Sequence, residues 1–134
     1  MPRLFRRLAP HLALFTVAAV TAFATDRTLA TGPWGGDKVI FEVVADGADV
    51  EFECARGRID TVITLDGKGD FDLPGTFGAE GRGPARDGDG AAANARYRGH
   101  VEGDTMALDV TVGDRQIGPF TLTRDRRPAL KKCR

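Results

Sequence analysis

The chain has 134 residues, and its 19 lysine and arginine side chains are balanced by 19 aspartate and glutamate side chains, so its formal charge at pH 7 is zero. A general nucleic-acid-binding protein has an excess of basic side chains that contact phosphates, and this composition excludes that class. The chain also contains no serine, which excludes a Ser-His-Asp hydrolase because the nucleophile is missing.

The first 24 residues have the features of an export signal. Three arginines open the segment, residues 12–21 are apolar, and Ala22 and Ala24 are the small residues that a signal peptidase requires. The uncharged apolar run is about 13 residues long, shorter than the roughly 20 that a membrane-spanning helix needs. We therefore expect residues 1–24 to be a signal peptide, with cleavage after Ala24 and with Ala30 as the alternative.

Cleavage after Ala24 leaves one domain of about 110 residues, exported to the periplasm or secreted. The signal holds three arginines and no acidic residue, so the remainder has 16 basic and 19 acidic side chains and a net charge of −3. No stable membrane span is expected once the signal is removed. The sequence does not distinguish the periplasm from the extracellular space.

The only two cysteines, Cys54 and Cys133, both remain after cleavage. In an oxidising compartment an isolated pair of this kind usually forms a disulfide. The bridge closes a loop of about 80 residues, which stabilises the fold by roughly 4.5 kcal/mol in the chain-entropy model. We therefore expect a structural disulfide between Cys54 and Cys133.

Residues 25–37 show no clear period, and we expect an extended segment there, followed by a single β-domain of residues 38–134. From Lys38 onward apolar side chains recur at every second position, the period of a strand with one buried face. Pro119 interrupts the last set and predicts a bulge or an edge. The expected core positions are Val50, Phe52, Cys54, Ile59, Thr61, Ile63, Leu65, Phe71, Leu73, Phe77, Tyr97, Val101, Met106, Leu108, Val110, Val112, Ile117, Phe120 and Leu122.

Turn residues separate these apolar sets. Strands about ten residues apart, each with one polar face, are typical of an antiparallel barrel or sandwich. We expect an all-β fold, a small antiparallel meander barrel of seven or eight strands, with a two-sheet sandwich as the alternative. The expected turns are Asp46-Gly47, Arg56-Gly57, residues 66–69, Gly103-Asp104 and Gly113-Asp114.

Residues 78–95 interrupt the strand pattern. They are rich in glycine and charge and have no apolar period. We expect a long, flexible and solvated loop, and the alternative is a mobile binding flap, because long loops in compact domains are often functional.

The residue types that catalytic and metal sites need are scarce. The only histidine after the signal, His100, is expected on the solvent-exposed face beside Arg98 and Glu102. One histidine and an oxidised cysteine pair cannot supply the three or four ligands of a zinc site. The acids of residues 66–72 alternate like those of a calcium loop, but Lys68 occupies a ligand position, which favours a hairpin turn. We therefore expect no enzymatic activity, no metal and no cofactor.

The C-terminal stretch, residues 124–134, carries six basic side chains against one acidic side chain, Asp125. We expect a solvated tail that is fixed at Cys133. The alternative is a basic patch that binds an anionic lipid or glycan.

Gly32-Pro33-Trp34 stands just before the first expected strand and resembles the Gly-x-Trp entry of lipocalin-like barrels. The resemblance implies that Trp34 closes the base of the barrel and that a basic residue after the last strand, here Arg124, covers its ring. A guanidinium over an indole contributes about 0.5 to 2 kcal/mol. The chain is shorter than a typical lipocalin and lacks its late helix.

Nearly all of the chain after the signal is similar to a set of small exported bacterial proteins with no assigned function. This similarity implies a fold and a disulfide, and it implies no activity. The matching motifs are Trp34-Gly35-Gly36, Cys54-Ala55-Arg56-Gly57, Tyr97-Arg98-Gly99-His100-Val101, Phe120-Thr121-Leu122 and Lys132-Cys133.

The barrel pattern and the missing catalytic residues favour a non-catalytic binding module that holds a small apolar ligand or a lipid in the barrel mouth. One alternative is an inhibitor or interaction protein of the cell envelope that acts on an exported protein, with residues 25–33 as a free segment that enters a cleft. Another is a structural envelope protein without a ligand. The sequence identifies neither the ligand or partner nor the oligomeric state.

Overall fold

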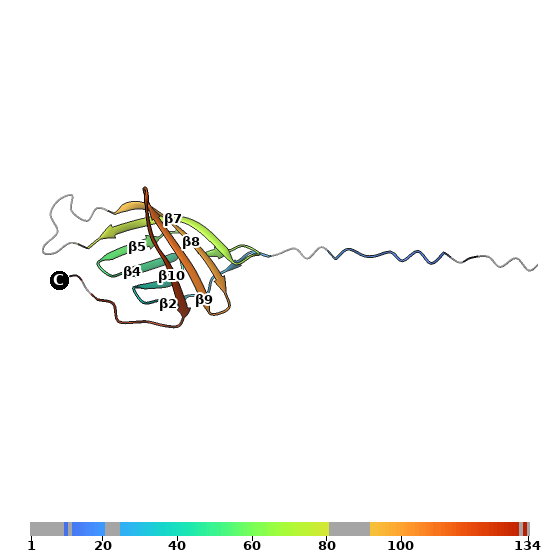
Figure 1. The fold of residues 1–134 in the computed structure, drawn as a ribbon, viewed down its shortest axis with the longest axis horizontal. Coiled ribbons are helices and arrows are strands. Elements are labelled where there is room, and N and C mark those ends of the chain that lie inside the picture. The colour runs from blue at the N-terminus through green and yellow to red at the C-terminus, as the bar shows by residue number, and fades with distance from the viewer. Residues whose placement is uncertain (1–9, 11, 21–24, 81–91, 132, 134) are drawn as a thin grey trace, which may run out of the picture.

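The computed structural model describes residues 10, 12–20, 25–80, 92–131 and 133. Within these residues all regular structure is β, and the strands form one closed barrel and one separate pair (Figure 1). The strands are β1 Arg27–Thr28, β2 Gly32–Gly35, β3 Val39–Val44, β4 Gly47–Phe52, β5 Ala55–Ile59, β6 Thr64–Leu65, β7 Asp70–Ala79, β8 Ala93–Glu102, β9 Thr105–Val112 and β10 Arg115–Arg124.

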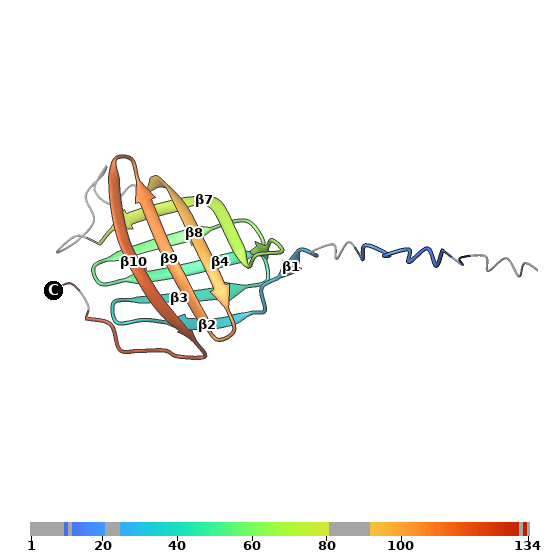
Figure 2. The ribbon, with the colours of Figure 1, turned by 45° about the vertical axis from the view of Figure 1, so that its right-hand side comes forward.

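Eight antiparallel strands close the barrel in the order β10-β2-β3-β4-β5-β7-β8-β9, and β9 pairs with β10 to complete the ring. The first and last strands of the ring meet over only two residue pairs, Gly35 with Thr123 and Trp34 with Arg124. Figure 2 shows β8, β9 and β10 crossing steeply over β3 and β4 of the opposite wall. The expected barrel is confirmed, and the sandwich alternative is wrong.

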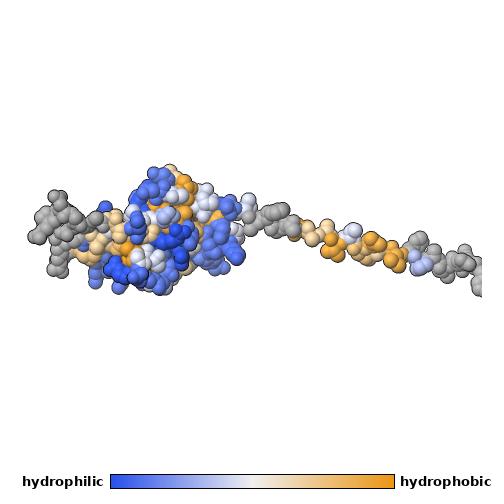
Figure 3. Space-filling view, turned by 90° about the horizontal axis from the view of Figure 1, so that it is seen from above, coloured by the Kyte–Doolittle hydropathy of each residue, from blue (hydrophilic) through white to orange (hydrophobic). Residues whose placement is uncertain are grey.

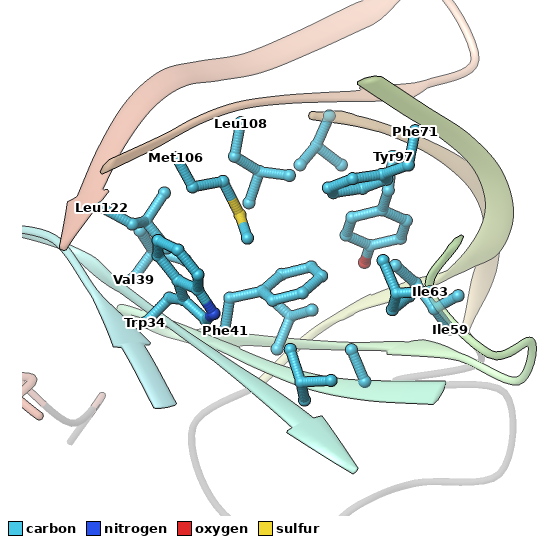
Figure 4. Packing of buried hydrophobic residues seen from close by; sticks show 14 of the residues in the cluster. Trp34, Val39, Phe41, Ile59, Ile63, Phe71, Tyr97, Met106, Leu108 and Leu122 are labelled. Carbon is cyan, nitrogen blue, oxygen red and sulfur yellow. The ribbon is translucent and has the colours of Figure 1, made fainter. Parts of the chain in front are cut away.

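Apolar side chains fill the barrel interior. Val39, Phe41, Tyr97, Met106 and Val110 are completely buried, and Figure 4 shows the labelled core side chains pointing inward from the surrounding strands. Full burial of one such side chain contributes about 1.5 to 3 kcal/mol. The core positions expected from the two-residue period belong to this cluster or pack against it, except Cys54 and Thr61. The prediction for Thr61 is wrong, because β5 ends at Ile59 and Thr61 is exposed.

Three phenylalanines occupy the end of the barrel beside the β4–β5 turn. The ring of Phe52 lies 5.2 Å from that of Phe77 and 5.8 Å from that of Phe120, measured between centroids. Aromatic pairs at these separations attract each other beyond the area that they bury. Partly buried Leu73 and Ile117, like Phe120, pack against the hydrophobic core. The barrel mouth, the ligand site suggested by the sequence, is therefore occupied by the protein's own side chains.

The N-terminal segment, expected to be extended and to precede the β-domain, belongs to the fold. β1 pairs with β6, and the buried Leu29 donates its N–H to the Ile63 carbonyl at 2.8 Å. β2 is a full strand of the barrel. The two-residue period does not reveal this segment because Gly32 and Pro33 interrupt it. Residues 25–33 are consequently not a free segment.

Two expected boundaries around β5 are also wrong. The turn lies at Glu53-Cys54 and not at Arg56-Gly57, because Cys54 takes a left-handed backbone with φ 63°. Gly57 lies within β5, where a Cβ atom would overlap the Tyr97 hydroxyl. β5 then ends at Ile59, and the apolar residues up to Leu65 cross the barrel base to reach β6 instead of extending the same strand.

The later connections mostly follow the sequence pattern. The turns at 66–69, Gly103-Asp104 and Gly113-Asp114 are confirmed, and a register shift between Ile117 and Phe120 confirms the bulge expected at Pro119. The expected loop of residues 78–95 is shorter at both ends, because β7 continues to Ala79 and β8 begins at Ala93. Residues 81–91, which form most of that loop, lie outside the described part of the chain.

The expected signal segment is described at residues 10 and 12–20 only, where it has no regular structure. Its large apolar side chains, from Leu12 to Val20, are 81–91% exposed and form the orange extension in Figure 3. Ala24, after which cleavage is expected, lies outside the described residues. No helix in the described part of the chain is long and apolar enough to cross a membrane.

The chain's only tyrosine, Tyr97, predicts a change in stability at alkaline pH. Its hydroxyl donates to the Thr76 carbonyl at 2.6 Å, and burial raises the pKa of Tyr97 above its ordinary value. Up to about pH 10 both the folded and the unfolded tyrosine are neutral. At higher pH the unfolded tyrosine ionises first, so the free energy of unfolding falls as pH rises.

The matched variant Tyr97→Phe cannot ionise at this position, so its stability is expected to fall less between about pH 9 and pH 11. Urea unfolding of both proteins across this range measures the difference, and the titration of lysines common to both cancels. Equal pH slopes in the two proteins would contradict the prediction.

Candidate functional site

The outer face of β7, β8 and β9 has a groove with a volume of about 370 Å³. This volume lies within the range of about 300–1,000 Å³ that is typical of ligand pockets. The small residues Gly99, Ala107 and Pro119 line it, and Pro119 is brought there by the bulge in β10. Among the outward positions here Ala107 carries little side-chain volume, which leaves room for the groove.

Two rows of outward side chains cross the three strands at this groove. In the first row Asp70 pairs with His100, and His100 pairs with Ala107. In the second row Asp72 pairs with Arg98, and Arg98 pairs with Asp109. Side chains at paired positions of antiparallel strands lie on the same face and contact each other. Strand pairing thus brings together six groove residues that are distant in the sequence.

Ion pairs and hydrogen bonds hold the charged groove residues. His100 Nδ1 lies 2.6 Å from Asp70 Oδ1. Asp72 Oδ2 lies 3.4 Å from Arg98 Nε, and Asp109 accepts a hydrogen bond of 2.7 Å from Gln116. These side chains are about half exposed, so each pair contributes little to stability. Their contacts instead fix the orientation of the polar groups around the apolar floor.

The groove has groups suited to recognition, and its lining contains no hydroxyl or thiol. An imidazole, a guanidinium and three carboxylates can form hydrogen bonds with a ligand. With Nδ1 directed at Asp70, His100 Nε2 lies 3.9 Å from the nearest Glu102 oxygen, beyond hydrogen-bond distance. The residues that line the groove include no serine, threonine or cysteine. This set of side chains can orient a ligand and offers no hydroxyl or thiol for covalent catalysis.

Trp34 and Arg124, the pair implied by the Gly-x-Trp resemblance, lie together at the base of the barrel. The Arg124 guanidinium carbon is 4.9 Å from the centroid of the Trp34 ring, which is only 1% exposed. Arg124 Nε lies 3.4 Å from Asp104 Oδ1, and the Arg124 N–H donates to the Asp104 carbonyl at 2.9 Å. Trp34 belongs to the core and Arg124 covers its ring from the exposed side; neither residue lines the groove.

Cys54 and Cys133 form the expected disulfide, with their Cα atoms 5.0 Å apart.

In the segment with a superficial likeness to a calcium loop, Asp66 Oδ1 accepts hydrogen bonds of 2.9 Å from the N–H groups of Asp70 and Lys68. These two bonds, that from Asp70 first, lower the pKa of Asp66. The Asp66 carboxylate therefore stabilises the hairpin turn.

The sequence placed His100 and Arg98 on the exposed face but did not reveal the groove. The other groove residues, among them Asp70, Asp72 and Asp109, lie on different strands, and the register between strands is not visible in the sequence. One local signal was available: Ala107 is a small residue at an outward position of a strand otherwise rich in larger side chains.

Comparison of this chain with models of known families, with curated proteins and with solved structures finds no match in any of the three. The functional proposal therefore rests on the groove and the fold alone.

Proposed function

We propose that this protein is an exported, non-catalytic binding module that takes a small, largely apolar ligand with a polar group. The observation that supports the proposal is the groove on β7–β9, whose apolar floor is bordered by charged side chains. Pockets of this kind bind by apolar contact and use a few polar groups for orientation. The disulfide supports an oxidising compartment as the place of action.

The proposal places the ligand on the outside of the barrel and not in its mouth. Aromatic contacts between Phe52, Phe77 and Phe120 already occupy the mouth. The inhibitor alternative loses its motivation, because β1 and Leu29 are attached to the barrel. A structural protein without a ligand is the second candidate, and the filled interior is the observation that favours it.

The test uses the neutral fluorescent probe N-phenyl-1-naphthylamine, titrated into the purified protein. We expect saturable binding of about one equivalent. Ala107→Trp fills the groove and is expected to weaken binding by at least about tenfold, which corresponds to 1.4 kcal/mol. Thr105→Trp, on the outer face of the same strand but outside the groove, is the matched control and is expected to leave binding unchanged.

Two results would count against the proposal. Absence of saturable probe binding would favour the structural protein. Equal binding by both tryptophan variants would place the probe away from the groove. Extraction of the protein from its own host, followed by mass spectrometry, then identifies the natural ligand.

A further inference from the structure

Residues 125–131 form a strap along the outside of the barrel; most of them are exposed, as expected of a solvated tail that is fixed at Cys133. The strap leaves the end of β10 and runs back beside β2 toward the C-terminus (Figures 1 and 2). The N–H of Asp125 donates to the Pro33 carbonyl at 2.8 Å, and Arg127 donates to Glu42 at 2.6 Å. Beyond the strap, Cys133 is bonded to Cys54.

The strap covers an apolar side chain that belongs to the outer face. Ile40 lies between Val39 and Phe41, which both face the interior, so Ile40 points outward. It is nevertheless only 5% exposed and does not belong to the interior cluster. Its partner on β2 is Gly35, where a Cβ atom would overlap strap residues 126 and 128. The strap therefore lies against the β2 backbone beside Ile40.

A second groove of about 370 Å³ lies along the strap. Ile40, Glu42 and Arg127 line it together with residues of β4 and β5. Arg127 is the contribution of the strap, so the position of the strap determines the shape of this groove. Detachment of the strap would open the groove and expose Ile40.

Barrel closure does not depend on the strap. All strand pairings of the barrel lie within residues 32–124, and the strap begins after β10 ends. Apart from the disulfide, the polar contacts described above are one backbone hydrogen bond and one ion pair, whose side chains are 56% and 32% exposed. Ion pairs this accessible to solvent hold weakly.

We propose that the Cys54–Cys133 disulfide is a redox-sensitive latch on this strap. With the disulfide intact the strap covers Ile40, and reduction releases the strap and uncovers the outer face of β2 and β3 while the barrel stays closed. Both cysteines are partly exposed, which gives a reductant access to the sulfur atoms.

The reductant is an external dithiol, such as an exported thiol-disulfide oxidoreductase. Its thiolate attacks one sulfur of the disulfide, the other sulfur leaves as a thiolate and takes up a proton, and a mixed disulfide forms. The second thiol of the reductant then breaks the mixed disulfide. Two electrons and two protons pass to this protein, which gains two thiols, and the dithiol becomes a disulfide.

Limited trypsin digestion tests the latch on the full protein, oxidised and reduced with dithiothreitol, with mass spectrometry to quantify each cleavage site. Reduction is expected to accelerate cleavage after Arg126 and Lys131 by at least about tenfold, because proteolysis follows the population of the open form. Cleavage after Arg96 and Arg98, on β8, is expected to stay unchanged. Arg127 precedes a proline and is not a trypsin site.

Two variants complete the experiment. Cys133→Ser is expected to show the fast strap cleavage without reductant. Gly35→Ala pushes against the strap and is expected to raise strap cleavage in the oxidised protein. Unchanged strap cleavage after reduction would overturn the latch. Equal acceleration at the β8 sites would overturn it as well, because it would mean that the barrel opens with the strap.

Discussion

Replacement of Trp34 by alanine is expected to lower the free energy of unfolding by about 4 kcal/mol, because removal of a buried tryptophan leaves a cavity. The indole is 1% exposed at the base of the barrel, and Figure 4 shows it pointing into the interior. Trp34 also belongs to the two-pair seam between β2 and β10, so the cavity adjoins the weakest pairing of the ring. Urea unfolding followed by far-ultraviolet circular dichroism measures the loss without relying on tryptophan fluorescence.

A double-mutant cycle separates the stacking of Arg124 from the cavity. Arg124→Gln is expected to cost about 0.5 to 1 kcal/mol when Trp34 is present. In the Trp34→Ala background only the loss of the Asp104 ion pair remains, so the cost should be smaller. Trp34→Phe, which keeps a ring, serves as the milder variant. A loss below about 1 kcal/mol for Trp34→Ala would contradict the role of this residue in closing the base.

A chain that begins at residue 31 is expected to lose about 3 kcal/mol of stability relative to one that begins at residue 25. The deletion removes Leu29, whose burial is comparable to that of other core leucines, and a loss of this kind costs about 2–5 kcal/mol. It also removes the β1–β6 pairing and the hydrogen bond to the Ile63 carbonyl. Urea unfolding followed by the fluorescence of the single tryptophan measures the difference.

The matched control begins at residue 27 and keeps both β1 and Leu29. The two residues that this control lacks, 25 and 26, are exposed, so its stability should stay within about 0.5 kcal/mol of the longer chain. Equal stability of all three chains would show that the N-terminal segment is dispensable. The expected loss, by contrast, would show that Leu29 and β1 stabilise the barrel.

The interior of the barrel was predictable because its signal is local. Met106, Leu108 and Val110 alternate with polar residues, and each apolar side chain faces inward as the period requires. The disulfide was predictable because only two cysteines exist. The Gly-x-Trp resemblance pointed to Trp34 and Arg124, which the structure brings into contact.

The outer surface was not predictable in the same way, because it depends on register and on long-range packing. Ile40 belongs to the continuous apolar run of β3, which does not show which of its two faces is the interior one. Nor does it show that a residue 85 positions later contacts Glu42. Leu29 is a single apolar residue without a period around it. The groove likewise forms only when β7, β8 and β9 are paired in their observed register.

The central claim is that binding takes place on the outside of a filled barrel. Titration of N-phenyl-1-naphthylamine into isotopically labelled protein, followed by proton–nitrogen correlation spectra, tests it most directly. We predict that the largest shift changes occur at Gly99, His100 and Ala107 around the groove, with little change at the aromatic mouth. Changes centred on Phe52, Phe77 and Phe120 would place the ligand in the interior and contradict the account.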